Sequence, residues 1–200
     1  MRKKIILLLG SLTLLAGTFA PASADIERKA TLSCEGNQMN VCLYIWPALP
    51  DLPGWNRDEE LSYHYNAAFM APVGDQTSSD AVVFLGSAVA EEGYKTDHPG
   101  PSALDSFIAD DNDNTRKDVP EAEITETDPA ITADGVSLRI FIIHKLKDGH
   151  SQILAFTEDG DKDGKFFCAL TLDSKSDMPV ENNLPLFRTW IGKYKHWKAN

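Results

Sequence analysis

Residues 136–172 alternate in the way that consecutive antiparallel strands require, and this segment constrains the fold more than any other. Two apolar runs, 136–146 and 152–158, meet at Asp148-Gly149, a dipeptide that favours a tight hairpin. A second polar turn leads into a third run over 165–172. In the first run, apolar side chains occupy both alternating sets of positions. We therefore expect a sheet with both faces partly covered.

Further strands are indicated on the N-terminal side of this segment. Ala30–Cys34 and Met39–Trp46 are apolar stretches around a polar turn, which favours an N-terminal hairpin. A proline-rich loop follows, because prolines at that density cannot occupy a central strand. Leu61–Met70 and Ala81–Ala90 have the composition of two more strands.

Two helices complete the expected elements. A capping box at Ser102–Asp105 begins a short helix, which the polar run Asp110–Asn114 is expected to end. Apolar residues at spacings of three and four indicate a closing helix: Leu184, Phe187, Ile191, Tyr194 and Trp197. The predicted class is α+β, an antiparallel sheet meander flanked by helices in an α/β/α sandwich.

This order of elements resembles the PsbP-like family of extracytoplasmic proteins. The resemblance covers about Trp55 to Tyr194. It depends on Gly54-Trp55, on Asp134-Gly135 before a long strand, and on the closing helix. It implies a sheet sandwiched by helices and an accessory, protein-binding role without a shared chemistry. The cysteine-containing N-terminal hairpin is not part of the resemblance.

The first 24 residues have the layout of a secretory signal peptide. A basic segment, Arg2–Lys4, precedes an uncharged apolar stretch from Ile5 to about Thr18, and Ala22-Ser23-Ala24 supplies a small-residue cleavage site. The apolar stretch is short for a membrane span. We therefore expect cleavage after Ala24 and a periplasmic or secreted protein, with no membrane insertion after cleavage.

Removal of this leader leaves one expected α+β domain, residues 25–200, in which 25–54 form the hairpin and loop and 55–200 the sheet with its helices. The leader carries three of the 19 basic residues, so 16 remain against 30 acidic residues, a net charge of −14 with His neutral. This charge repels nucleic-acid backbones and anionic lipids and favours a basic protein partner. The alternative is that the acidity only keeps the protein soluble.

Three cysteines remain in the expected mature chain, and an odd number allows one bridge and leaves one thiol. Cys34 and Cys42 flank the polar turn of the N-terminal hairpin, so we expect a local disulfide between them. Cys168 shares a predicted strand face with Phe166 and Leu170, and we expect it in the core.

Sequence motifs for covalent chemistry are missing: the chain has no Gly-x-Ser-x-Gly, His-Glu-x-x-His or Cys-x-x-Cys. We therefore expect no enzyme. A hydrolase remains the alternative, because geometry and not spacing defines a catalytic triad. Its signature would be a pocket in which a histidine is hydrogen-bonded to both a serine and an aspartate.

The most specific local motif is a possible half of a calcium loop. Asp159, Asp161 and Asp163 with Gly164 match the first half of an EF-hand loop, but Leu170 stands where a bidentate Glu is required. Two interpretations stay open, a looser calcium site or a solvated Asp/Gly hairpin turn. We expect no other cofactor.

Four aromatic residues, Trp46, Trp55, Tyr63 and Tyr65, lie close together in the sequence among prolines. They are candidates for a ligand or partner surface, and the alternative is ordinary core packing. Taken together, these patterns predict an exported, soluble, non-enzymatic binding protein of the bacterial periplasm. Its role would be that of an accessory or inhibitor/immunity-type factor for a protein partner. A calcium or small-ligand module is the remaining alternative.

Overall fold

The structure is a computed structural model that describes residues 26–35, 38–74, 82–146, 149–175 and 178–198. Within the first hairpin, the side chains of residues 30–42 lie outside the described part. The expected leader over residues 1–24 lies outside it as well. No helix in the described ranges is long and apolar enough to span a membrane.

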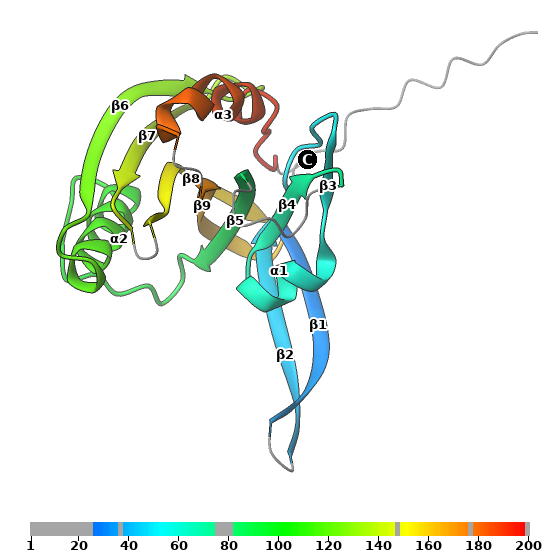
Figure 1. The fold of residues 1–200 in the computed structure, drawn as a ribbon. Helices are drawn as coiled ribbons and strands as arrows, with labels where there is room; N and C mark the ends of the chain where they lie inside the picture. The colour runs from blue at the N-terminus through cyan, green and yellow to red at the C-terminus, as the bar shows by residue number, and fades with distance from the viewer. Residues whose placement is uncertain (1–25, 36–37, 75–81, 147–148, 176–177, 199–200) are drawn as a thin grey trace, which may run out of the picture.

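A seven-stranded antiparallel sheet forms the centre of the molecule (Figure 1), with the strand order β3-β4-β5-β9-β8-β7-β6. Four strands that follow one another in the sequence, β6 to β9, are neighbours in the sheet. The alternation of residues 136–172 predicted β7, β8 and β9, whereas β6 lies before that segment and was not predicted. Together with the three α-helices of the described residues, the sheet makes the protein an α+β structure. The strands are β3 (Trp55–Arg57), β4 (Ala68–Pro72), β5 (Val82–Ala90), β6 (Glu123–Ile131), β7 (Ser137–His144), β8 (Ser151–Asp161) and β9 (Gly164–Ser174).

The N-terminal strands form a separate two-stranded ribbon. β1 (Ile26–Glu35) pairs with β2 (Gln38–Pro47), and Figure 1 shows the ribbon projecting from the body of the molecule. Near its base β2 lies against β5. There Gly86 of β5 provides room for the side chains of Pro47 and Leu49.

Helices cover both faces of the sheet, as the two-sided apolar pattern predicted. On one face, Phe107 of α2 (Ala103–Asp118) stacks on Phe167 of β9. On the other face, the fully buried Trp190 of α3 (Leu184–Ile191) stacks on Phe84 of β5 with ring centroids 4.3 Å apart. Burying an aromatic side chain of this size contributes roughly 2–3 kcal/mol, so both helices are anchored by their apolar stripes.

The prediction of a strand over Leu61–Met70 is wrong in its first half. Residues 59–65 form helix α1 (Glu59–Tyr65), and only the end of the segment belongs to β4. The Asp58 side chain accepts a 2.9 Å hydrogen bond from the Leu61 N–H and caps the helix. Asn66 ends it in the left-handed conformation, with φ 50°. These capping residues outweigh the alternation of the apolar side chains.

The second helix is longer than predicted. The polar run Asp110–Asn114 does not end α2, which continues to Asp118. The polar side chains find partners around the helix: Asp110 accepts a 2.7 Å hydrogen bond from Tyr94, and Asp113 pairs with Lys117 one turn later at 2.8 Å. The polar composition of the run predicts a loop, whereas these contacts stabilise it as a helix.

The closing helix is shorter than predicted. α3 ends at Ile191, and Gly192 serves as its C-cap residue. Tyr194 and Trp197 continue the spacing of the apolar stripe, yet they belong to a C-terminal tail without regular secondary structure. Tyr194 is fully buried all the same, because the tail returns along the sheet. The 3-10 helix η2 (Val180–Asn183) precedes α3.

Candidate functional site

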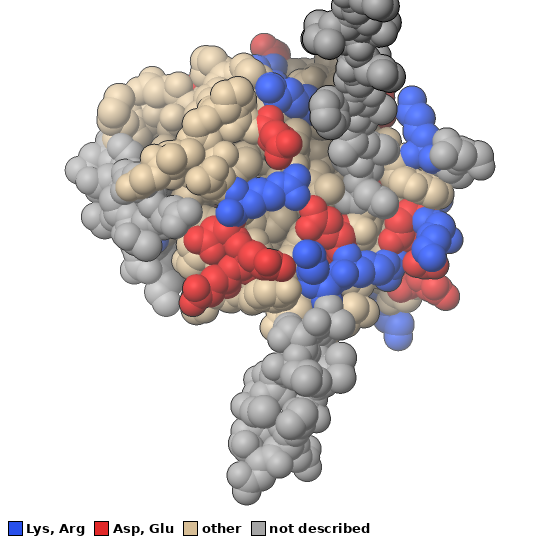
Figure 2. Space-filling model, turned by 90° about the vertical axis from the view of Figure 1, so that its right-hand side faces the viewer, with Lys and Arg blue, Asp and Glu red and all other residues tan. Residues whose placement is uncertain are grey.

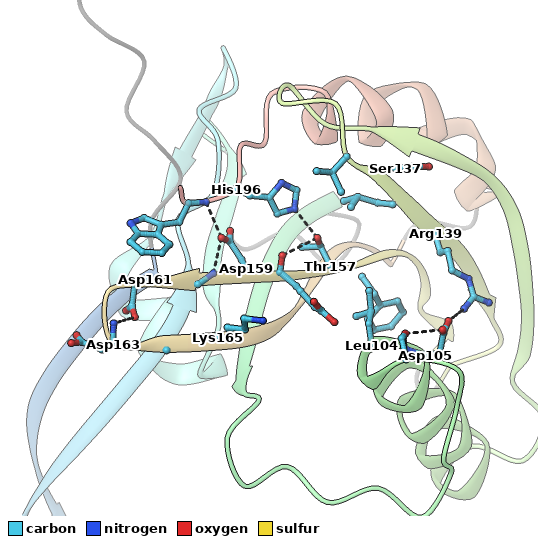
Figure 3. A pocket seen from close by; sticks show the side chains of 18 of the residues that line it. Leu104, Asp105, Ser137, Arg139, Thr157, Asp159, Asp161, Asp163, Lys165 and His196 are labelled. Atoms are coloured by element: carbon cyan, nitrogen blue, oxygen red, sulfur yellow. Dashed lines mark hydrogen bonds and ion pairs between the residues drawn. The ribbon is translucent and has the colours of Figure 1, made fainter. Parts of the chain in front are cut away.

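A pocket of about 990 Å³ lies at the end of the sheet where β8 extends beyond the start of β7 (Figure 3). Its wall combines the beginning of α2, the beginning of β7, the β8–β9 hairpin and the C-terminal tail. Figure 3 shows Leu104 and Asp105 on the α2 side, with Thr157 and His196 on the opposite side. Pockets of this size accommodate small ligands or short chain segments.

The pocket exists because two neighbouring strands end at different levels. The pairing of β7 with β8 stops at Arg139 and Phe156. The pairing of β8 with β9 continues to Asp161 and Gly164. The last part of β8 therefore has a neighbouring strand on one side and the pocket on the other.

A carboxylate, an imidazole and a hydroxyl form a chain of hydrogen bonds at the pocket. Nδ1 of His196 lies 3.0 Å from Asp134 Oδ2, and Nε2 lies 2.7 Å from Thr157 Oγ1. Because the carboxylate can only accept, we assign the ring proton to Nδ1, which leaves Nε2 to accept from the Thr157 hydroxyl. Burial alone would raise the pKa of Asp134, but hydrogen bonds from Thr132 and His196 outweigh it and lower that pKa.

This arrangement is the one named above as the signature of a hydrolase, with threonine in the place of serine. A hydroxyl whose proton is held by an imidazole, itself oriented by a carboxylate, can act as a nucleophile. Thr157 lines the pocket, yet only 2% of its surface is exposed. The hydroxyl is thus oriented for chemistry but scarcely open to a substrate.

A second polar network lies beside the first and involves Asp159. Its Oδ2 accepts a 2.5 Å hydrogen bond from the Tyr194 hydroxyl, and its Oδ1 accepts one of 2.9 Å from the Trp197 N–H. Burial raises the pKa of Tyr194 well above its ordinary value. Asp134 and Asp159 together therefore fasten the C-terminal tail to the sheet.

Ion pairs fix the rim of the pocket. Arg139 contacts Glu126 at 2.7 Å and Asp105 at 2.9 Å, which joins β6, β7 and the start of α2. Arg28 of β1 contacts Asp161 at 2.8 Å and so joins the ribbon to the β8–β9 hairpin. Figure 2 shows acidic and basic side chains interspersed on the face turned to the viewer. These contacts leave much of the rim charge locally neutralised.

The three aspartates of the predicted calcium loop do not share one centre. Asp159 lies within β8, buried against Tyr194, and the turn itself begins only after Asp161. Asp161 points to Arg28, and Asp163 lies 3.9 Å from the same guanidinium. In the described part of the chain, no three His, Cys, Asp or Glu side chains are grouped so that they could hold a metal ion. A calcium site there would need these existing contacts to break.

The four aromatic candidates do not form one platform either. Trp46 is 2% exposed and packs edge-on against Tyr63. Trp55 packs on Phe84 of the core. Tyr65 is 52% exposed and stacks on Phe69. Of the four, Tyr65 alone is exposed, and the ligand or partner surface stays a prediction.

The cysteines are described to different extents. Cys168 is fully buried in β9, as predicted, and burial raises the pKa of its thiol. The side chains of Cys34 and Cys42 lie outside the described part. The expected disulfide between them therefore stays a prediction.

Sequence reasoning did not find the residues that meet at the pocket. Asp134, Thr157 and His196 come from the turn before β7, from β8 and from the tail, with no motif spacing among them. The only signal was the Asp134-Gly135 dipeptide, noted as a landmark before a long strand. Compared with models of known protein families and with curated proteins, the chain matches none.

Proposed function

We propose that the protein is an exported, soluble binding protein of the bacterial periplasm, which acts as an accessory or inhibitor/immunity-type factor for a protein partner. The leader-like segment 1–24 supports export, and the net charge of −14 expected after its removal favours a basic partner. Complementary charge would raise the rate of encounter and orient the two proteins.

The observation that carries this proposal is that the polar groups at the pocket are hydrogen-bonded within the protein. His196 binds Asp134 and Thr157, and Asp159 binds Tyr194 and Trp197 of the C-terminal tail. These contacts give the pocket a fixed shape. Apolar groups such as Leu104 and Val136 lie in the same wall as charged ones. A preformed pocket of mixed chemistry supports binding without covalent chemistry.

The fold supports the same role. We propose that the sheet with helices on both faces is a PsbP-like sandwich, in keeping with the landmarks Gly54-Trp55 and Asp134-Gly135. That family resemblance implies an accessory function and assigns no residue a chemical role.

The test is a pull-down from periplasmic extract with residues 25–200 as bait, at low and at high salt. We expect a basic protein that is retained at low salt and lost at high salt, since charge attraction is screened by salt. Two matched variants locate its site: Val136→Arg at the pocket and Val73→Arg, at an exposed position that does not line it. Only the first should reduce recovery. Recovery of no protein at either salt would contradict the proposal.

A second candidate function is hydrolysis at Thr157, which the distances of 2.7 and 3.0 Å around His196 favour. The Thr157 oxygen would attack an ester carbonyl and pass its proton to His196 Nε2. The alcohol would leave with that proton, and water would then release the acyl group from the threonine.

A fluorophosphonate probe distinguishes the two candidates. A hydrolase would form a covalent adduct on Thr157, detectable by mass spectrometry, and would lose p-nitrophenyl ester hydrolysis by about 10³-fold or more in Thr157→Val. A binding protein would form no adduct, and its residual ester hydrolysis would be equal in the parent and in Thr157→Val. Melting temperatures of both forms control for unfolding.

A further inference from the structure

We propose that the pocket accepts an extended peptide segment of the protein partner, which adds as a strand to the open edge of β8 and whose residues alternate between basic and apolar. This inference deepens the binding role proposed above and rests on it.

Beyond Phe156, the backbone groups of alternate β8 residues point to the open side of the strand. The Lys165 carbonyl of β9 accepts a 2.9 Å hydrogen bond from the Glu91 N–H, so it points away from β8. Gly160 lies opposite Lys165 and therefore forms a pair without mutual hydrogen bonds. Its backbone groups point to the open side, and so do those of Glu158, two residues earlier, because the direction alternates along a strand.

Among these backbone groups, a ligand could use the N–H of Glu158. The Gly160 N–H already donates to Asp159 Oδ1 at 2.8 Å. The N–H of Glu158 points to the side on which the ladder to β7 has ended. A strand edge without a neighbouring strand is a template for another chain. In the described part of the chain, β8 has no neighbouring strand on this side beyond Phe156, and the edge forms part of the wall of a pocket of about 990 Å³. The pocket thus lies directly beside the Glu158 N–H.

A strand added at this edge would meet different side chains on its two sides. Glu158 is exposed and projects towards the α2 side, where Lys165 and the already paired Asp105 and Arg139 also line the pocket. Leu138 and Trp197 line the side from which Thr157 projects. Side chains of an extended peptide alternate between the two sides, so a basic residue would meet the Glu158 carboxylate and apolar residues would meet Leu138 and Trp197. The acidic net charge favours the same ligand.

The experiment uses residues 25–200 and a terminally blocked ten-residue peptide of alternating lysine and valine. Two variants at one position separate the backbone from the side chain: Glu158→Ala removes the carboxylate, and Glu158→Pro removes the carboxylate and the N–H. Proline is tolerated at an open strand edge, so Glu158→Pro should melt close to Glu158→Ala. By titration calorimetry, we expect Glu158→Pro to bind about tenfold more weakly than Glu158→Ala, the effect of losing one backbone hydrogen bond.

Amide exchange followed by NMR gives a second measurement that does not depend on either variant. Addition of the peptide to the parent protein should protect the Glu158 amide. Strand addition is overturned by absence of peptide binding, by binding that leaves this amide unprotected, or by equal affinities of two folded variants. If the pull-down recovers a partner that both variants bind equally, the binding function stands and only the strand addition fails.

Discussion

The Tyr194 hydroxyl donates a 2.5 Å hydrogen bond to the buried carboxylate of Asp159, and this contact joins the C-terminal tail to the end of β8. Tyr194 is fully buried and Asp159 is 7% exposed. The bond therefore satisfies a carboxylate oxygen that water reaches poorly. Hydrogen bonds to charged groups at such sites contribute more than those between neutral groups.

Tyr194→Phe should destabilise the protein by about 2–3 kcal/mol, because it leaves Asp159 Oδ2 without its hydrogen-bond donor. Unfolding in urea, followed by circular dichroism, measures this loss. Tyr65→Phe is the matched control, since Tyr65 is 52% exposed and its hydroxyl reaches solvent. Equal stabilities of the two variants would show that the Asp159 contact contributes little.

Asp111→Asn should stabilise the protein at neutral pH, because burial raises the pKa of Asp111 to about 6. Between the ordinary pKa near 4 and this value, the folded form binds more protons than the unfolded form, so stability falls as the pH rises. The asparagine side chain does not ionise, so the stability of the variant does not fall in this way as the pH rises. We expect a gain of about 1–3 kcal/mol at pH 7 that disappears below about pH 4.

The opposite behaviour of a neighbouring residue provides the control for this prediction. A hydrogen bond from Lys117 holds the pKa of Asp113 below its ordinary value. Its stabilising contribution is present above the unfolded pKa and is lost as the pH falls. Asp113→Asn should therefore lower stability at pH 7, and urea titrations of both variants at pH 4 and pH 7 compare the two signs. A loss of stability at pH 7 in Asp111→Asn would contradict the assignment.

The sequence predicted the sheet better than the helices, and the reason is physical. In β7 the positions of Ile140 and Phe141 directly report the two faces of the sheet, because the alternation of a strand needs no distant partner. The limits of α2 and α3 depend instead on tertiary contacts. Tyr94 supports Asp110 within α2, and the tail after Gly192 leaves the helical path to reach the sheet.

The candidate site could not be predicted from the sequence, because it too depends on tertiary contacts. Asp134, Thr157 and His196 become neighbours only when the turn before β7, the end of β8 and the tail are assembled. The motif that did stand out, Asp159 to Gly164, separates in the structure into a buried carboxylate and an ion-paired turn. Local spacing predicts a ligand set only where one loop supplies all of the ligands.

Gly86→Ala should destabilise the protein by about 1–3 kcal/mol through overpacking. A Cβ atom at this position would lie 2.5 Å from Leu49 Cδ2 and 2.9 Å from Pro47 Cγ. The leucine can rotate, but the proline ring cannot move without shifting β2. Gly164→Ala is the control, because a Cβ there meets no atom within 4 Å. The melting temperatures of the two variants should differ by several degrees. Equal melting temperatures would show that Pro47 and Leu49 shift at little cost to make room for the Cβ atom.

The number and reactivity of the thiols test the predicted disulfide. The raised pKa and full burial of Cys168 should make it unreactive towards iodoacetamide in the folded protein. After denaturation without reductant, a Cys34–Cys42 bridge leaves one reactive thiol per chain, whereas prior reduction exposes all three cysteines. Mass spectrometry of residues 25–200 counts the adducts in each state. Cys168→Ser should show no adduct before reduction, and three adducts on the unreduced, denatured parent would mean that the chain carries no bridge.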